Sequence, residues 1–228
     1  MPKKRLQRID FQWSSNLAYA VGLITTDGNL SPDHRHISLT SKDVQLLKTF
    51  KQCLNIKNRI CKNTKGTFPG STYAFKVSFG NVVLYDWLIK IGLMPKKSLV
   101  IGKLKIKDKY FKDFLRGHLD GDGSIFTYID DYSAYLNPKY VYKRLYVTFI
   151  SSSENHIIWL QNKIIRLLKV TGSKSVKRSK SQVGTSNQYV IRFSKKEAIK
   201  LLNQIYYKPN LPCLKRKYNI AKPFLNFT

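Results

Sequence analysis

One short motif occurs twice in the chain, and this repeat constrains the fold more than any other feature. Residues 19–31 read YAVGLITTDGNLS and residues 114–124 read FLRGHLDGDGS. An offset of 95 residues aligns Gly22 with Gly117 and Asp27 with Asp122. Residues 37–56 then resemble 147–170, and residues 73–93 resemble 189–207. Three matches in the same order indicate a duplication, so we expect two halves with similar folds.

Each half has the pattern of a helix, two strands, a helix, two strands and a helix. Residues 15–26 carry apolar and small side chains in a helical pattern that ends near Gly28. Apolar and polar residues alternate from residue 36 to 40, as in a strand with one buried face. Amphipathic helices are expected from Ser41 or Lys42 to residue 54 and from residue 153 to 169. Residues 172–188 are predicted to form a long hairpin. The expected division is a first repeat at 1–98, a connector at 99–109 and a second repeat at 110–228.

The net charge indicates a polyanionic partner. The chain has 41 Lys and Arg against 13 Asp and Glu, a formal charge of +28. Nucleic acid fits this excess best, because each phosphate that is neutralised releases counterions. An anionic membrane surface or a ribosome is the alternative on charge alone.

Targeting signals and cysteine usage favour an intracellular protein, in a bacterial cytoplasm or an organelle matrix. No apolar run is long enough to span a bilayer, and the N-terminus lacks the apolar stretch of a secretory signal. The three cysteines have no C-x-x-C spacing, so we expect reduced thiols and no zinc site.

The motif itself predicts a pair of carboxylates. Gly22 and Gly117 leave one face of each motif helix smooth, which lets two helix backbones approach closely. Asp27 and Asp122 would then meet at the C-terminal ends of the helices, where two negative charges repel. An Asp-Gly pair at a helix end is commonly only a turn. Two copies in a basic chain instead predict a site for divalent cations, which suits metal-assisted phosphodiester hydrolysis.

The motifs AVGLITTDG (20–28) and LRGHLDGDG (115–123) resemble the two signatures of the LAGLIDADG homing endonucleases in their single-chain form. In the first motif Thr25 stands where the second has the acid Asp120. The resemblance implies an α+β fold of two pseudo-symmetric αββαββα repeats, with the motif helices at the centre and a saddle of antiparallel sheets on duplex DNA. It also implies a monomer that cuts a long asymmetric site with Mg²⁺ or Mn²⁺.

The resemblance assigns roles to individual residues. Asp27 and Asp122 match the catalytic, metal-binding acids, and the carbonyls of Thr26 and Gly121 match further metal ligands. Lys195 corresponds roughly to a basic residue near the cleaved phosphates, with Phe79 as its counterpart in the first half.

The polar faces of the expected strands supply candidate DNA contacts. They are Ser38, Thr40, Arg59, Lys76, Ser78, Arg144, Tyr146, Thr148, Gln188, Arg192 and Ser194. Lys76 and Arg192 are expected at equivalent positions of the two repeats. An ordinary polar sheet face is the alternative for any one of these residues.

Two other functions fit the same fold. One is an RNA maturase that assists intron splicing, which can share both the fold and the acids. The other is a DNA-binding regulator that does not cleave, although regulators of this lineage carry an extra helix-turn-helix domain and only about 20 residues follow the last repeat helix. Intein activity is disfavoured, because the chain begins at Met1 and ends at Thr228.

Overall fold

A computed structural model describes residues 12–63, 73–132, 135, 137, 139–178 and 186–226. The first half contains α1 (Ser15–Thr26), β1 (Gly28–Leu30), β2 (His36–Ser41), α2 (Val44–Leu54), β3 (Ile60–Asn63), β4 (Ala74–Gly80) and α3 (Val82–Lys90). The second half contains α4 (Phe111–Asp120), β5 (Ser124–Asp130), β6 (Tyr142–Ser151), α5 (Glu154–Leu168), β7 (Ser173–Lys177), β8 (Gln188–Ser194) and α6 (Lys195–Ile205). The helix α7 (Lys215–Ala221) follows.

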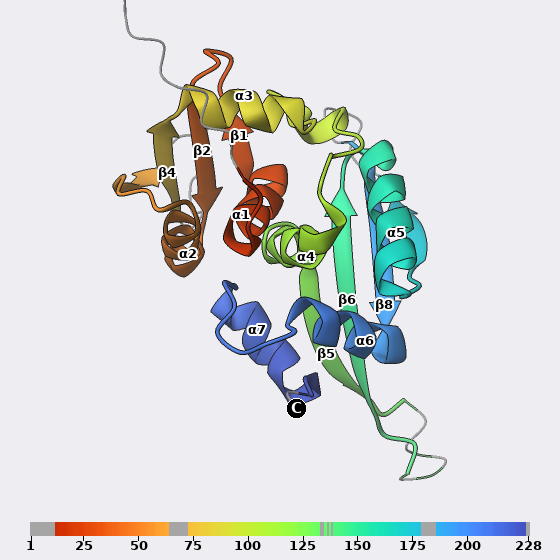
Figure 1. Ribbon diagram of the computed structural model, residues 1–228. Helices are drawn as coiled ribbons and strands as arrows, with labels where there is room; N and C mark the ends of the chain where they lie inside the picture. The colour runs from red at the N-terminus through yellow and green to blue at the C-terminus, as the bar shows by residue number, and fades with distance from the viewer. Residues whose placement is uncertain are drawn as a thin grey trace, which may run out of the picture.

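The two halves have the same order of elements, αββαββα, as the repeated sequence predicts. Each half forms one antiparallel sheet of four strands, in the order β1-β2-β4-β3 and β5-β6-β8-β7. Figure 1 shows α1 and α4 side by side between the two sheets. The α+β fold with paired motif helices at its centre is therefore confirmed.

The two motif helices pack with almost no side chain between them. A Cβ atom added to Gly22 would lie 2.2 Å from the Phe114 carbonyl oxygen, and one added to Gly117 would lie 2.1 Å from that of Tyr19. Neither position can therefore hold a larger residue unless the helices separate. This packing confirms the expectation that glycines let the motif helices approach closely.

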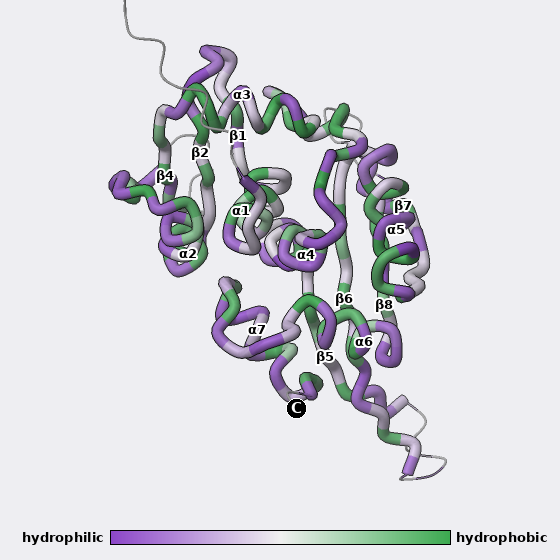
Figure 2. The backbone as a smooth tube through the Cα atoms, in the orientation of Figure 1, coloured by the Kyte–Doolittle hydropathy of each residue, from purple (hydrophilic) through white to green (hydrophobic). Residues whose placement is uncertain are grey.

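The outer helices follow their amphipathic patterns. Hydrophobic and hydrophilic residues are interspersed along α5 (Figure 2). Ile157, Leu160 and Ile164 form its buried face. Ser153 is the N-cap of α5, and its Oγ accepts from the His156 N–H. The prediction for α2 was wrong at its start, because α2 begins at Val44. Ser41 is still paired with Phe75 in β2, so the helix starts only after the strand ends.

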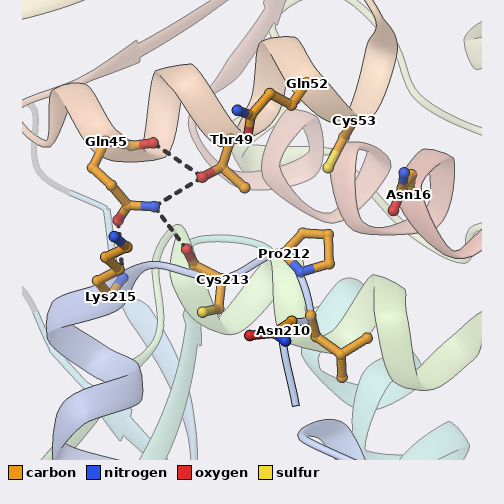
Figure 3. Close-up of a pocket in the computed structure, with 10 residues that line it drawn as sticks. Asn16, Gln45, Thr49, Gln52, Cys53, Asn210, Pro212, Cys213 and Lys215 are labelled. Atoms are coloured by element: carbon orange, nitrogen blue, oxygen red, sulfur yellow. Dashed lines mark hydrogen bonds between the residues drawn. The ribbon is translucent and has the colours of Figure 1, made fainter. Parts of the chain in front are cut away.

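The segment after α6 returns to the first half and joins the two repeats. Gln45 of α2 donates to the Cys213 carbonyl at 3.0 Å, and its Oε1 accepts from the Lys215 N–H at 2.9 Å. Arg216 pairs with Asp43 at 3.1 Å. Figure 3 shows the pocket of about 380 Å³ at this junction, with Gln45, Thr49 and Cys213 in contact. Among the described residues, no helix is both long and apolar enough to cross a bilayer.

Candidate active site

The motif helices place two carboxylates at one end of the helix pair. Asp27 caps the C-terminus of α1, and its N–H donates to the Leu23 carbonyl at 3.0 Å. Gly121 caps α4, and Asp122 follows it directly. A Cβ on Gly121 would lie 3.2 Å from Asp27 Oδ2, so the end of α1 touches the end of α4. The structure thus brings the two predicted acids to the same place.

Both carboxylates are held where ionisation is difficult. Burial, followed by the charge of Asp122, raises the pKa of Asp27 to about 7. Asp122 is solvent-exposed at the mouth of the site, but the surrounding protein still raises its pKa by desolvation. A negative charge at a helix C-terminus is also opposed by the helix dipole. The pair therefore favours a cation between or beside the two acids.

Lys217 of α7 is a buried cation at this site. It is 3% exposed, and its Nζ donates to the carbonyls of Leu119, Asp120, Gly121 and Gly123 at 2.7, 2.8, 2.9 and 2.7 Å. Leu119 and Asp120 end α4, and Gly121 and Gly123 follow it, so the positive charge lies at the helix C-terminus, where it is favourable. Burial lowers the pKa of Lys217 to about 8, and Asp120, Asp27 and Asp122 oppose that shift.

Lys97 is the counterpart of Lys217 in the first half. It is 6% exposed, and its Nζ donates to the Gly28 carbonyl. Gly28 and Gly123 are equivalent in the repeat, so each lysine binds the same carbonyl of its own motif. Burial lowers the pKa of Lys97, and Asp122 and Asp27 oppose the shift. Two lysines related by the pseudo-twofold therefore flank the two acids.

The donor set fits a hard divalent cation. Asp27 and Asp122 supply carboxylate oxygens, and the carbonyls of Thr26 and Gly121 lie next to them in the chain, which matches the oxygen ligands of Mg²⁺ or Mn²⁺. The Gly121 carbonyl already accepts one bond from Lys217. In the described part of the chain, no group of three or more His, Cys, Asp or Glu could hold a metal. Water or a phosphate would therefore have to complete the coordination.

A small polar cavity lies beside Asp122. Its volume is about 120 Å³, and Thr26, Ser98 and Ser151 are among its lining residues. This space is large enough for several water molecules with polar partners. Water can therefore reach the Asp122 carboxylate through this cavity.

Asp120 has a different place from Asp122. It is 1% exposed, and its Oδ2 accepts from the Tyr19 hydroxyl at 2.8 Å and from the Leu214 N–H at 2.7 Å. Burial raises its pKa. Asp120 thus ties α4 to α1 and to the segment before α7, while Thr25 in the first motif bonds only to the Val21 carbonyl of its own helix.

Strand register places the predicted DNA-contact residues on one face of each sheet. Ser38 pairs with Ser78 and Thr40 pairs with Lys76 in the first sheet. Tyr146 pairs with Ser194 and Thr148 pairs with Arg192 in the second. Arg144 lies on the same face of β6, Gln188 begins β8, and Arg59 precedes β3. Six of these residues are exposed: Arg59, Ser78, Arg144, Gln188, Arg192 and Ser194.

Two of the predicted contacts are buried. Ser38 is 4% exposed and Thr148 is 5% exposed, because each lies on a central strand between two neighbours. Thr148 also bonds to Ser124, with 2.6 Å between the hydroxyl oxygens. The expectation that these two side chains are free for DNA is corrected, since each is buried between its cross-strand neighbours.

Register also corrects the predicted matching of the repeats. Ser38 faces Asn29 and Ser78, and Thr148 faces Ser124 and Arg192. The equivalent of Arg192 is therefore Ser78, and Lys76 lies two residues away. The same alignment makes Asn81, the N-cap of α3, the counterpart of Lys195. Lys195 is an exposed first residue of α6.

Sequence reasoning missed Lys97 and Lys217. Each comes after the last helix of its repeat, in the stretches MPKKS (94–98) and LPCLKRKY (211–218). A lysine shortly after a proline in both stretches was the available signal. It also missed Phe126 and Tyr128, which lie on the same face of β5 as the predicted residues of β6.

Solved structures of other proteins share the fold of two repeats with paired motif helices. No protein-family model matches the chain, and no curated protein matches its sequence. The homing endonuclease I-WcaI bound to its DNA recognition sequence superposes with a TM-score of 0.62 at 10% identity, over 99% of this chain and 96% of that one. The I-LtrWI LAGLIDADG homing endonuclease bound to target DNA gives 0.56 at 14% identity, over 92% and 89%.

A third similar structure belongs to a longer protein. Full-length DUF199/WhiA from Thermatoga maritima gives a TM-score of 0.53 at 14% identity, over 97% of this chain and 65% of that one. At these identities the comparisons establish the fold. The chain therefore has the fold of the LAGLIDADG homing endonucleases, as its two motifs predict.

Proposed function

We propose that the chain is a metal-dependent endonuclease that cuts both strands of one long, asymmetric DNA site as a monomer. The observation that carries the proposal is the meeting of Asp27 and Asp122 at the ends of twin helices, between the buried cations Lys97 and Lys217. An active site with two equivalent halves suits the two strands of a duplex.

The surroundings of the site support DNA as the substrate. The chain has a formal charge of +28, and exposed polar and basic residues line one face of each sheet. Phosphate contacts would position the duplex, and base contacts would select the sequence. The fold is shared with structures described as homing endonucleases bound to DNA, and I-DmoI is described in complex with DNA and Mn and with DNA and Ca.

The chain's own residues have distinct tasks. Asp27 and Asp122, with the carbonyls of Thr26 and Gly121, would hold Mg²⁺ or Mn²⁺. When bound, a divalent cation activates water and offsets charge on the attacked phosphate. Lys97 and Lys217 keep the two acids together by offsetting their repulsion, and they add positive charge where phosphates arrive. Lys195 remains a proposed phosphate contact at the start of α6.

The test is incubation of the protein with a randomised duplex library in Mg²⁺ or Mn²⁺, followed by sequencing of cut ends. The proposal predicts a single non-palindromic site of about 20 base pairs, cut in both strands. Tight binding of such a site without any cut would favour the non-cleaving regulator. Stimulation of intron splicing, without DNA cleavage, would favour the RNA maturase.

A further inference from the structure

Three aromatic side chains form a stacked cluster on the open face of the second sheet. The rings of Phe126 and Tyr146 lie 5.2 Å apart at 20°, and those of Tyr128 and Tyr146 lie 6.1 Å apart at 9°. Register confirms that they share a face, since Phe126 pairs with Tyr146 and Tyr128 pairs with Arg144. We refer to Phe126, Tyr128 and Tyr146 as the aromatic platform.

Two of the three rings are exposed, and one of them, Phe126, is wholly apolar. Phe126 is 38% exposed and Tyr128 is 47% exposed, on the face that carries Arg144 and Arg192. The Arg192 guanidinium lies 5.5 Å from the centre of the Tyr146 ring, and Arg144 is held by Asp130 at 2.7 Å. Phe126 has no group that can bond to water, so its exposure is unfavourable until an apolar surface covers it.

The first sheet has no such platform at the equivalent places. The same face carries Asn29 on β1, His36, the buried Ser38 and Thr40 on β2, and Lys76 and Ser78 on β4. His36 stands at the place of Tyr146, but its ring contacts the Asp33 carboxylate and stacks on no aromatic neighbour among the described residues of that face. By repeat position, Ser124 corresponds to Asn29, and β1 ends before it reaches the equivalent of Phe126. The two halves therefore present different chemistry to a duplex, one polar and one aromatic.

The major groove of DNA offers one apolar group to such a surface. Base edges there carry hydrogen-bond donors and acceptors, except for the C5-methyl group of thymine. Phosphates can satisfy arginines and lysines, but their charged oxygens are poor partners for a phenylalanine ring. An exposed ring that is braced by stacked neighbours is suited to contact a methyl group.

We propose that the aromatic platform recognises thymine methyl groups, so that the DNA half-site under the second sheet is selected for T·A pairs. This inference rests on the proposed function and adds the basis of specificity in one half of the site. Phe126 lies four residues after Asp122, which is about 13 Å along an extended strand. The preferred thymines are therefore expected roughly four to six base pairs from the centre of cleavage, since a base pair rises about 3.4 Å.

The test removes only the methyl groups. Binding is measured in Ca²⁺ on the site selected from the randomised library, and on copies in which uracil replaces thymine in one half-site or the other. Uracil under the second sheet should weaken binding about four-fold for each buried methyl, and uracil under the first sheet should leave it nearly unchanged. A footprint of the bound protein assigns each half-site to its sheet.

Substitutions in the protein test whether the weaker binding of uracil-containing sites depends on the aromatic platform. Phe126→Asn should reduce the preference for thymine over uracil, while Phe126→Leu, which remains apolar, should keep most of the preference. Ile129→Ala is the matched control, because Ile129 is 66% exposed on the same strand but alternates to the other face. Thermal unfolding of each variant checks that the fold is kept.

The outcomes separate this inference from the proposed function. Equal binding of thymine and uracil in both half-sites, with cleavage intact, would overturn the inference and leave the nuclease standing. An equal loss from both half-sites would also overturn it, because the platform is on one sheet only. Failure to bind any duplex would overturn the proposed function itself.

Discussion

Replacing Lys217 by methionine tests how the twin helix ends are held together. Methionine fills the space of the lysine stem but has no ammonium group, so the four carbonyls at and just after the end of α4 lose their shared donor. A hydrogen bond to a charged group contributes about 1.5–3 kcal/mol, and relief from burying the charge offsets part of that loss. We expect Lys217→Met to lower the free energy of unfolding by about 2–4 kcal/mol.

The pseudo-symmetric variant gives the internal comparison. Lys97 donates to a single carbonyl, that of Gly28, so Lys97→Met should lower the free energy of unfolding by only about 1–2 kcal/mol. Lys215→Met is the control, because the Lys215 side chain is exposed and its contact with Gln45 is made by the backbone N–H.

Urea unfolding and thermal melts at pH 6.5 provide the readout. For a chain of this length, the Lys217 variant should melt about 4–16 °C lower than the parent. A melting temperature within a degree or two of the parent would refute the view that this lysine fastens α7 to the active site. A larger effect at Lys97 than at Lys217 would refute the comparison of the two helix ends.

Three further predictions concern packing, pH and salt. Gly117→Ala should destabilise the fold severely or prevent soluble expression, because its Cβ would lie 2.1 Å from the Tyr19 carbonyl oxygen. A free energy of unfolding equal to that of the parent would contradict the close packing of the motif helices. The pKa of Asp27 is about 7, well above its usual value, so the native metal-free protein keeps a proton that the unfolded chain has lost. The free energy of unfolding in EDTA should therefore fall as pH rises from about 4 to about 7, and Asp27→Asn should flatten this dependence on pH. If the free energy of unfolding of the parent rises over this range instead, the pKa of Asp27 is not raised. DNA affinity should fall by at least about 10³ between 50 and 200 mM salt, measured by fluorescence anisotropy, and a flat response would exclude phosphate-dominated binding.

The duplicated motif made most of the fold predictable. The glycines and acids of the two motifs fixed where two helices could meet, because only small residues allow that approach. The strands and their buried faces followed from alternation of apolar residues. These signals are local, or they repeat along the chain.

The residues that were missed or misplaced depend on contacts between distant segments. Lys217 reaches the end of α4 from 94 to 98 residues away, and no pattern near Asp122 indicates it. The matching of Lys76 with Arg192 failed because an alignment of sequences can slip by two residues and keep every side chain on its face. Phe126 and Tyr128 were overlooked because their face is set by the pairing of β5 with β6.

We propose that Asp27 and Asp122 together hold the cations used in DNA cleavage. The most direct test is double-strand cleavage of the selected site in Mg²⁺ by the parent, Asp27→Asn and Asp122→Asn, with binding in Ca²⁺ measured in parallel. Asparagine keeps the size of the side chain and removes one ligand charge. Both variants are expected to bind DNA as the parent does, and neither should cut both strands. Full cleavage by either variant would contradict this proposal.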